Sequence, residues 1–314
     1  MISPLKSESI RAVLLTFLIG TTGVVNIVEA APCCSAGSAL PALITSDDVG
    51  QFSVNQSMSS TVMDASSRGP AIVRSDSSAE STLSTRILAA TKISEYFQIG
   101  GGFSFLSRST SVSGKEFQES GLGDTELSVG YEFLPEWNYS RYRPKGVLYL
   151  QNVFPTGKAI QDPAALNIAD VRGQGVFQNV FGAAFTKAFS DFDFYVTPEI
   201  RRLHSKTFSG GTRVSGTWGG ALQLGAGWSM SREPIRFSLR TQPTFQGGRI
   251  VENADQTSLS GDKWVWNTGA DATYTFNEVN VLLLSYSDQT LFGPARNTTL
   301  ERSLGVGYLR RWEP

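Results

Sequence analysis

One segment of the chain, residues 218–230, alternates strictly between apolar residues and small or polar ones. Its even positions are Trp218, Gly220, Leu222, Leu224, Ala226, Trp228 and Met230. Its odd positions hold only glycine, alanine, glutamine and serine. A period of two predicts a β-strand with one apolar face. Ten such residues, tilted by about 40°, rise roughly 25 Å, which is the height of the lipid-facing band of a membrane barrel.

Residues 264–276 repeat this design. One face carries Trp264, Trp266, Ala270, Ala272, Tyr274 and Phe276, and the other carries Asn267, Gly269, Asp271, Thr273 and Thr275. A soluble β-sandwich also alternates, but it has no reason to place aromatic residues at both ends of an apolar face. Barrels in membranes do so, because aromatic side chains form girdles at the two interfaces. The two segments therefore favour a transmembrane barrel over a sandwich.

The composition agrees with a single barrel domain. The chain has 314 residues, a length that closed β-barrels reach as one domain. Charged residues make up 18%, below the roughly 25% of soluble proteins. After the N-terminal region there is no apolar run of about 20 residues, which excludes a helical membrane protein. The net charge of −1 gives no indication of nucleic acid as a partner.

The N-terminal region has the features of an export signal. Lys6 and Arg11 precede an apolar stretch, and Val28-Glu29-Ala30 fits the small-x-small cleavage rule. We therefore predict a signal peptide at 1–30, a periplasmic segment at 31–48 and a barrel at 49–314. Cys33 and Cys34, the only cysteines, do not form a disulfide framework, and whether they have any role is open. Whether residues 31–48 enter the barrel is open too.

Strand-like segments recur along the rest of the chain, and about twelve are expected. They are residues 51–63, 80–92, 96–107, 124–133, 146–154, 175–189, 192–204, 218–230, 235–245, 263–276, 279–290 and 300–312. Connections alternate between short and long, and 109–119 is predicted to be one of the long loops. Pro198 is expected to mark a bulge. The predicted fold is an all-β, antiparallel, up-and-down transmembrane barrel with short periplasmic turns and longer extracellular loops, and with both termini in the periplasm.

Two short motifs resemble those of a known group of channels. They are Gly121-Leu122-Gly123-Asp124, followed by the strand Leu127-Ser128-Val129-Gly130-Tyr131-Glu132-Phe133, and the strand end Asn152-Val153-Phe154-Pro155-Thr156-Gly157. Both resemble Gram-negative outer-membrane β-barrel channels of the meta-pathway phenol degradation group. The resemblance covers about 40 residues. It implies a monomeric or oligomeric barrel that passes small, including apolar, molecules, and it identifies no catalytic residue.

Polar residues on the alternating strands are predicted to face the lumen, because a charge facing the bilayer centre costs about 2–4 kcal/mol for lysine or arginine. The predicted lumen-lining residues are Glu126, Glu132, Asp193, Glu199, Arg201, Arg236, Arg240, Gln242 and Asp271. The predicted aromatic girdle consists of Trp218, Trp228, Trp264, Trp266, Tyr274, Tyr308 and Trp312. Opposed arginine and carboxylate groups either form a pore-lining field or a salt-bridged plug.

Catalysis has little support in the sequence. Known barrel phospholipases place a serine two residues after a histidine on the same strand face, together with an asparagine that orients the histidine. Here the single histidine, His204, is followed directly by Ser205 and Lys206, so that spacing is absent. A lone histidine is a poor metal site. We therefore predict no catalytic residue, no metal and no cofactor.

Three functions remain open. The first is a passive channel for small solutes through a mixed-charge lumen, the second is a closed structural or surface-interaction barrel whose outer loops bind a partner, and the third is a barrel hydrolase. The expected partners are outer-membrane lipid and a small-molecule solute, and the sequence leaves homo-oligomers open. The last strand, with Leu304, Val306, Tyr308 and Trp312 on one face, resembles the signal read by the barrel-assembly machinery. It departs from that signal at Arg310 and at Glu313-Pro314.

Overall fold

The structure is a computed structural model that describes residues 41–67, 71–75, 78–112, 115–135, 142–162, 168–254 and 256–312. The predicted signal peptide, Cys33 and Cys34 lie outside the described residues. Strands follow one another around a closed ring in chain order, each antiparallel to its neighbours, and the last strand pairs with the first. The sequence prediction of an all-β, up-and-down barrel is confirmed.

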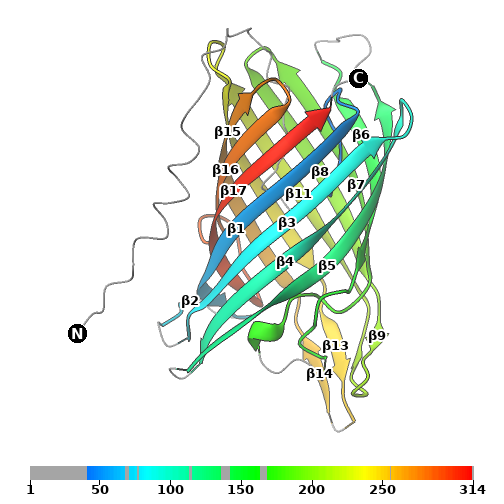
Figure 1. The fold of residues 1–314 in the computed structure, drawn as a ribbon. Coiled ribbons are helices and arrows are strands. Elements are labelled where there is room, and N and C mark those ends of the chain that lie inside the picture. The colour runs from blue at the N-terminus through cyan, green and yellow to red at the C-terminus, as the bar shows by residue number, and fades with distance from the viewer. Residues whose placement is uncertain are drawn as a thin grey trace, which may run out of the picture.

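Twelve strands form the ring (Figure 1). They are β1 (Gly50–Ala65), β3 (Glu80–Lys92), β4 (Phe97–Val112), β5 (Lys115–Leu134), β6 (Lys145–Phe154), β7 (Gln178–Phe189), β8 (Phe192–Leu203), β11 (Thr217–Ser229), β12 (Ile235–Gln246), β15 (Lys263–Phe276), β16 (Asn280–Asp288) and β17 (Thr298–Trp312). Among the described residues, no helix is long and apolar enough to cross a membrane.

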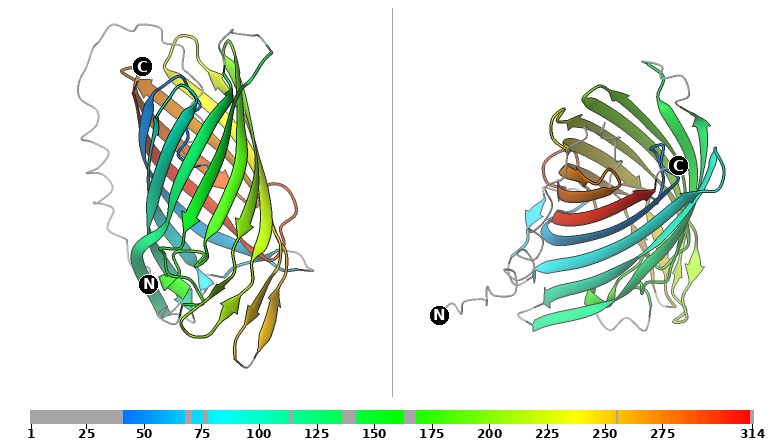
Figure 2. Two further views of the ribbon diagram at one scale, coloured as in Figure 1. Left: turned by 90° about the vertical axis from the view of Figure 1, so that its right-hand side faces the viewer. Right: turned by 45° about the horizontal axis from the view of Figure 1, so that its top comes forward.

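The two ends of the barrel differ. One end, called the turn end below, carries the start of β1, the end of β17 and connections such as 190–191 and 277–279. The other, the loop end, carries the longer connections and a small sheet beyond the ring. That sheet is made of β9 (Lys206–Thr207), β10 (Arg213–Val214), β13 (Arg249–Glu252) and β14 (Thr257–Ser260), while β2 (Ile72–Val73) extends the edge of β1. Figures 1 and 2 show the small sheet projecting from one end of the tilted barrel.

Two predictions about local structure were wrong. Residues 109–119 do not form a loop, because β4 and β5 continue as a hairpin paired as far as Val112 and Lys115. Pro198 marks no bulge, since the register between β8 and β11 runs through it unbroken, opposite Leu222. Its side chain is exposed on the outer face. The pairing of β8 with β7 is interrupted beside it and resumes in the same register, so the missing N–H removes ladder bonds without shifting the strand.

The wall has an apolar outside and a polar inside, as the alternation predicted. Leu239, Ile200 and Leu304 are all more than half exposed on the outer face. The predicted girdle residues fall near the two ends of their strands, with Trp218, Trp264 and Trp266 towards the loop end and Trp228, Tyr274, Tyr308 and Trp312 towards the turn end. Trp266 is only half-exposed, because the chain at Gly293 passes over its ring.

Glycines make room for tyrosines on the inside of the wall. Tyr149 lies over Gly182 and Tyr195 lies over Gly225, each on the neighbouring strand, and a Cβ at either glycine would overlap the tyrosine ring. Both rings are at least 96% buried. Because an aromatic ring covering a glycine fills the space that the missing side chain leaves, these pairs fix the register of their strands.

This packing gives a first prediction. Replacing Gly225 by valine is expected to destabilise the folded barrel by about 1–3 kcal/mol, because the added methyl groups force the Tyr195 ring out of its position. Urea unfolding in lipid vesicles measures this loss. Ala226→Val, one residue further on and facing outward, is the matched control and should change the unfolding midpoint little. Equal losses in the two variants would contradict the role of the Tyr195 contact.

Candidate functional site: the lumen

The lumen is the candidate site, because polar residues of many strands converge there. The structure places all nine predicted lumen-lining residues on inward positions of β5, β8, β12 and β15. Seven of them are buried: Glu132, Asp193, Glu199, Arg236, Arg240, Gln242 and Asp271. Glu126 and Arg201 are partly exposed, with 12% and 22% of their side-chain surface accessible.

A bidentate ion pair joins two strands that are not neighbours. Arg236 on β12 donates from Nε and Nη2 to the Asp193 carboxylate on β8, at 2.7 and 2.6 Å. The guanidinium reaches Asp193 across β11 because Gly227 lies between them, and a Cβ there would overlap the Arg236 side chain. Both partners are about 95% buried. Arg240 makes a second pair with Asp271 on β15, at 3.1 Å.

Two further carboxylates are held by mixed partners. Glu199 accepts a hydrogen bond from the Tyr149 hydroxyl at 2.6 Å and from Arg201 Nε at 3.0 Å. Glu126 accepts hydrogen bonds from Arg86 at 2.6 Å and from Gln151 at 2.7 Å. Arg86, Tyr149 and Gln151 were not among the predicted site residues. The alternation of polar and apolar residues could have identified them, because each occupies an inward position of its strand.

The stretch of wall formed by β16, β17 and β1, between β15 and β3, is mostly small and neutral at the middle of its strands, and is called the neutral wall below. Its inward positions there carry Ser285, Ser287, Gly305, Gly307, Asn55 and Ser57 beside the apolar Leu283, while the buried charge of Arg311 lies nearer the turn end. Paired charges on most of the strands and hydroxyl, amide and glycine groups on the neutral wall give the lumen a mixed polarity without a large excess of either sign of charge. Such a lining can orient a dipolar solute without excluding ions of one charge.

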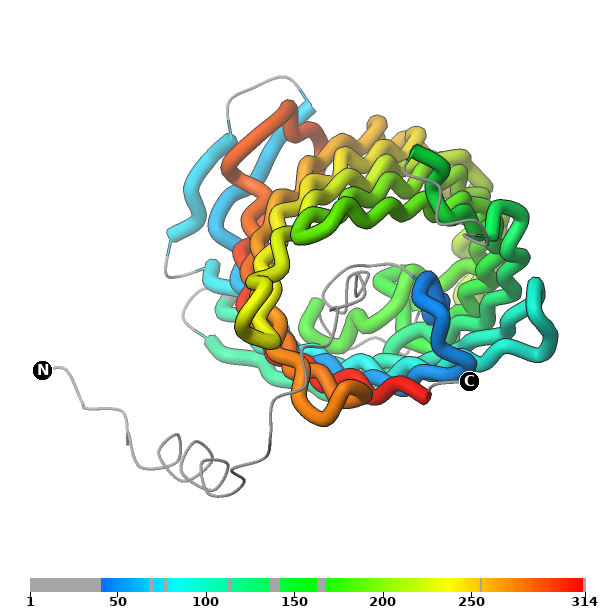
Figure 3. Tube along the Cα trace, turned by 90° about the horizontal axis from the view of Figure 1, so that it is seen from above, coloured from blue at the N-terminus to red at the C-terminus, as the bar shows by residue number. Residues whose placement is uncertain are grey.

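The segment before β1 lies inside the barrel (Figure 3). Ala42, Leu43 and Ile44 are buried, and the Gln98 side chain pairs with the Ile44 backbone as a strand would, accepting from its N–H at 2.6 Å and donating to its carbonyl at 2.9 Å. The Ser128 hydroxyl donates to the Ala42 carbonyl at 3.0 Å. Residues 41–48, called the inner segment below, therefore narrow the lumen near the turn end.

A charge also holds the inner segment. The ammonium of Lys145, which is 96% buried, donates to the Ser46 carbonyl at 2.8 Å and lies 3.0 Å from Asp47 and 3.6 Å from Glu132. Gly100 allows the close approach, because a Cβ there would overlap the Ala42 carbonyl. The sequence left open whether residues 31–48 enter the pore. For residues 41–48, which the structure describes, they do.

A second segment enters the lumen from the loop end. The connection between β6 and β7, which includes the 3-10 turn η2 (Ile168–Asp170), is held against β5 by Asp124. The Asp124 carboxylate accepts hydrogen bonds from the backbone N–H groups of Gly157 at 3.1 Å and Gln174 at 2.9 Å. The Asp124 of the motif noted in the sequence therefore fixes this connection.

A lumen pocket of about 490 Å³ lies beside this connection. Its charged lining comes from Arg86, Arg108, Asp124, Glu126 and Arg172, and its apolar lining includes Leu106, Val153 and Val171. Arg86 is paired with Glu126, and Arg172 lies 3.2 Å from Asp170. The volume is that of a small-molecule site, which usually combines apolar walls with a few polar groups that orient the ligand.

His204 lies at the loop end of β8. Its Nε2 is 2.6 Å from the Asn179 side chain, and its ring packs against Phe177. No serine hydroxyl is hydrogen-bonded to this ring among the described residues. The described part of the chain also contains no group of three metal-ligating side chains. The described contacts therefore orient the His204 imidazole through Asn179 and Phe177.

Comparison with known proteins bears on the fold. The sequence matches no protein-family model and no curated protein. Among solved structures, an outer-membrane channel from Pseudomonas putida F1 is 14% identical, with a TM-score of 0.66, and the match covers 90% of this chain and 100% of that one.

Two other barrels are more distant. The NanC porin is 10% identical, covers 82% of this chain and 98% of that chain, and has a TM-score of 0.45. A mutant of the TodX monoaromatic hydrocarbon channel is 10% identical, covers 88% and 93%, and has a TM-score of 0.47. The likeness to the Pseudomonas channel shows that this chain has the fold of an outer-membrane barrel channel.

Proposed function

We propose that this protein is a passive channel in the outer membrane of a Gram-negative cell and admits small solutes through its mixed-charge lumen. The observation that carries the proposal is the lumen pocket, where charged and apolar groups line a space of about 490 Å³ inside a closed barrel. The fold shared with the Pseudomonas channel supports it. The turn end then faces the periplasm, and the loop end faces outward.

The finer parts of the proposal rest on the sequence. Residues 1–30 are a signal peptide that is removed on export, and the barrel-assembly machinery inserts the exported chain. The motif at Gly121-Leu122-Gly123-Asp124 resembles that of the meta-pathway phenol degradation channels and supports a solute that is small and includes apolar molecules. The apolar residues of the lumen pocket, Leu106, Val153 and Val171, suit such a solute. We propose no enzymatic activity, because Ser205 directly follows His204 and the two-residue spacing of barrel phospholipases is therefore absent.

Current across a planar bilayer tests the channel. Protein shown to be folded by its heat-shifted gel mobility is expected to give discrete ohmic steps. These steps should be small, because the inner segment and the β6–β7 connection both narrow the lumen. If folded protein gave no current, the proposal would be overturned and the alternative, in which the outer loops bind a partner, would be favoured. In that case, trimming residues 64–78 and 248–260 would abolish binding of a partner while leaving the barrel folded.

Ion selectivity tests the lumen residues. Replacing Arg236 and Arg240 by alanine leaves Asp193 and Asp271 without their partners, so the lumen becomes more negative. In a tenfold salt gradient, the reversal potential is expected to move by about 10 mV towards the cation limit of about 59 mV. Arg202→Ala is the matched control, since Arg202 stacks on Trp218 on the outer face. An unchanged reversal potential in the double variant would contradict the lumen assignment.

A further inference from the structure

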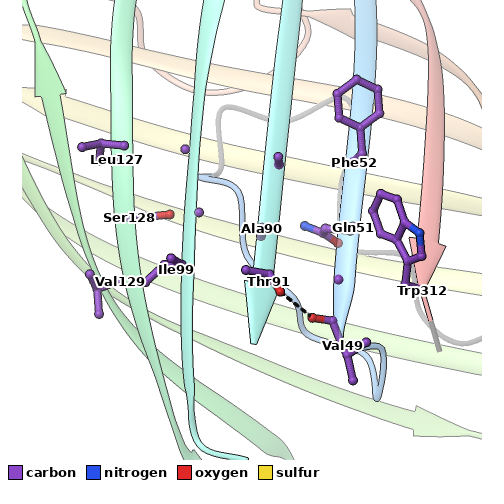
Figure 4. Close-up of a pocket in the computed structure, with 14 residues that line it drawn as sticks. Val49, Gln51, Phe52, Ala90, Thr91, Ile99, Leu127, Ser128, Val129 and Trp312 are labelled. Atoms are coloured by element: carbon purple, nitrogen blue, oxygen red, sulfur yellow. Dashed lines mark hydrogen bonds between the residues drawn. The ribbon is translucent and has the colours of Figure 1, made fainter. Parts of the chain in front are cut away.

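The outer face of the barrel is hollowed near the turn end. A groove of about 900 Å³ crosses β1, β3, β4 and β5 and is bounded at one side by the last residue of β17. Figure 4 shows Phe52 and Trp312 at one side of this groove and Ile99, Leu127 and Val129 at the other. The groove lies outside the lumen site, since these five side chains point away from the barrel interior.

Strand register explains the shape of the groove. One row of paired outward residues runs Trp312, Gly50, Thr91, Ile99 and Val129, and the adjacent row runs Arg310, Phe52, Ala89, Gly101 and Leu127. Each row has large side chains at its two ends and small ones in the middle. Paired residues point to the same side of the sheet, so the small residues line up as a floor between two walls. The sizes of the side chains in these two rows therefore determine the shape of the groove.

The groove is apolar along its floor and walls. Gly50, Ala89 and Gly101 offer no polar side-chain atom, and the Thr91 hydroxyl donates to the Val49 carbonyl at 3.3 Å. Ile99 and Leu127 are 44% and 58% exposed. An apolar groove that runs across four strands fits a hydrocarbon chain better than it fits a polar solute.

A cation lies at one end of the groove. Arg310 is exposed on the outer face, and its guanidinium is 5.8 Å from the centre of the Trp312 ring. No carboxylate of the described residues forms an ion pair with it. Arg310 is paired with Asn280, the first residue of β16, so it lies close to the membrane boundary at the turn end. An arginine at this height, beside an interfacial tryptophan, is placed to bind a phosphate group.

The polarity of the groove matches that of a membrane phospholipid. Trp312 ends β17, whereas Val129 lies five residues before Leu134, the end of β5, and so deeper in the wall. We propose that the groove holds one acyl chain of a phospholipid from the leaflet at the turn end, and that Arg310 binds its phosphate. The juxtaposition of an exposed guanidinium, which forms no ion pair with the described residues, and an apolar groove shaped by side-chain size carries this proposal. The proposal does not depend on whether the lumen conducts.

Native mass spectrometry of the full-length folded barrel tests the proposal, with phosphatidylglycerol as the probe. The unmodified protein is expected to retain one phospholipid after detergent exchange. Arg310→Gln removes the phosphate contact and Ala89→Leu fills the floor, and each should lower the retained fraction at least about threefold. Arg202→Gln and Ala272→Leu are the matched controls, because Arg202 lies over Trp218 near the other rim and Ala272 faces outward on β15. Both controls should retain the lipid.

Three outcomes would overturn the proposal. Equal retention by the two groove variants and the unmodified protein would show that lipid binds elsewhere. If diacylglycerol, which lacks the phosphate, were retained as well as phosphatidylglycerol, Arg310 would not bind the phosphate. A dimer of the unmodified protein that Ala89→Leu dissociates, with no bound lipid, would show that the groove is an interface between copies of this chain. Heat-shifted gel mobility of each variant confirms that the barrel compared is folded.

Discussion

Removing residues 41–47 from the exported chain is expected to raise the single-channel conductance of the barrel about threefold or more. These residues include Ala42, Leu43 and Ile44, whose side chains are at least 91% buried between the strands. Deleting them replaces packed side chains and backbone by water, and conductance rises with the free cross-section. Planar-bilayer recording measures the change on protein with the same heat-shifted mobility as the parent.

A substitution variant distinguishes the effect of removing the inner segment from the effect of removing the hydrogen bonds that hold it. Gln98→Ala together with Ser128→Ala removes three hydrogen bonds to the segment backbone but leaves its residues in place. We expect larger current fluctuations and an intermediate mean conductance, because the segment is then less firmly held. Ser57→Ala with Ser285→Ala, on the neutral wall, is the control and should leave the conductance unchanged. If the deletion also left it unchanged, the inner segment would not be the constriction.

The barrel could be predicted because lipid constrains the outer face of every strand. The alternation around Trp218 and Trp264 specifies a strand, its lipid-facing side and the approximate span of the membrane in one pattern. The sequence did not predict that β4 and β5 extend as a hairpin, because the requirement for an apolar outer face ends at the membrane interface. Beyond the interface both faces of the hairpin are exposed to water, so residues such as Glu116 and Gln118 occupy paired strand positions as readily as apolar residues do.

The lumen was only partly predictable. Alternation places Asp193 and Arg236 on inward positions, but they belong to strands separated by β11, and their pairing depends on register and on the small size of Gly227. The entry of the inner segment depends on Gln98 and Lys145, which hold it largely through backbone groups that have no signature in the sequence. The apolar groove depends on the register of five strands, β17, β1, β3, β4 and β5. Sequence patterns describe one strand at a time, so features shared by several strands need the structure.

The buried pair of Asp193 and Arg236 gives the largest expected effect on stability. Asp193→Ala removes the carboxylate that accepts two hydrogen bonds from the Arg236 guanidinium, which is 96% buried, and should cost about 3–5 kcal/mol in the free energy of unfolding. Arg236→Met in the same chain removes the buried charge itself, so the double variant is expected to recover most of the loss. Urea unfolding in lipid vesicles, followed by tryptophan fluorescence, measures both.

A comparison with an exposed ion pair shows whether the loss of stability comes from the burial of the charge or from the loss of any ion pair. Asp64 pairs with Arg74 at 2.7 Å outside the lumen, but half of its side chain is exposed, so Asp64→Ala should cost less than about 1 kcal/mol. If burial sets the cost, the two aspartate variants differ several-fold and only Asp193→Ala is rescued by removing its arginine. A double variant as unstable as Asp193→Ala would show instead that the methionine fails to pack over Gly227, and the ion pair would then be needed for its shape as well as its charge.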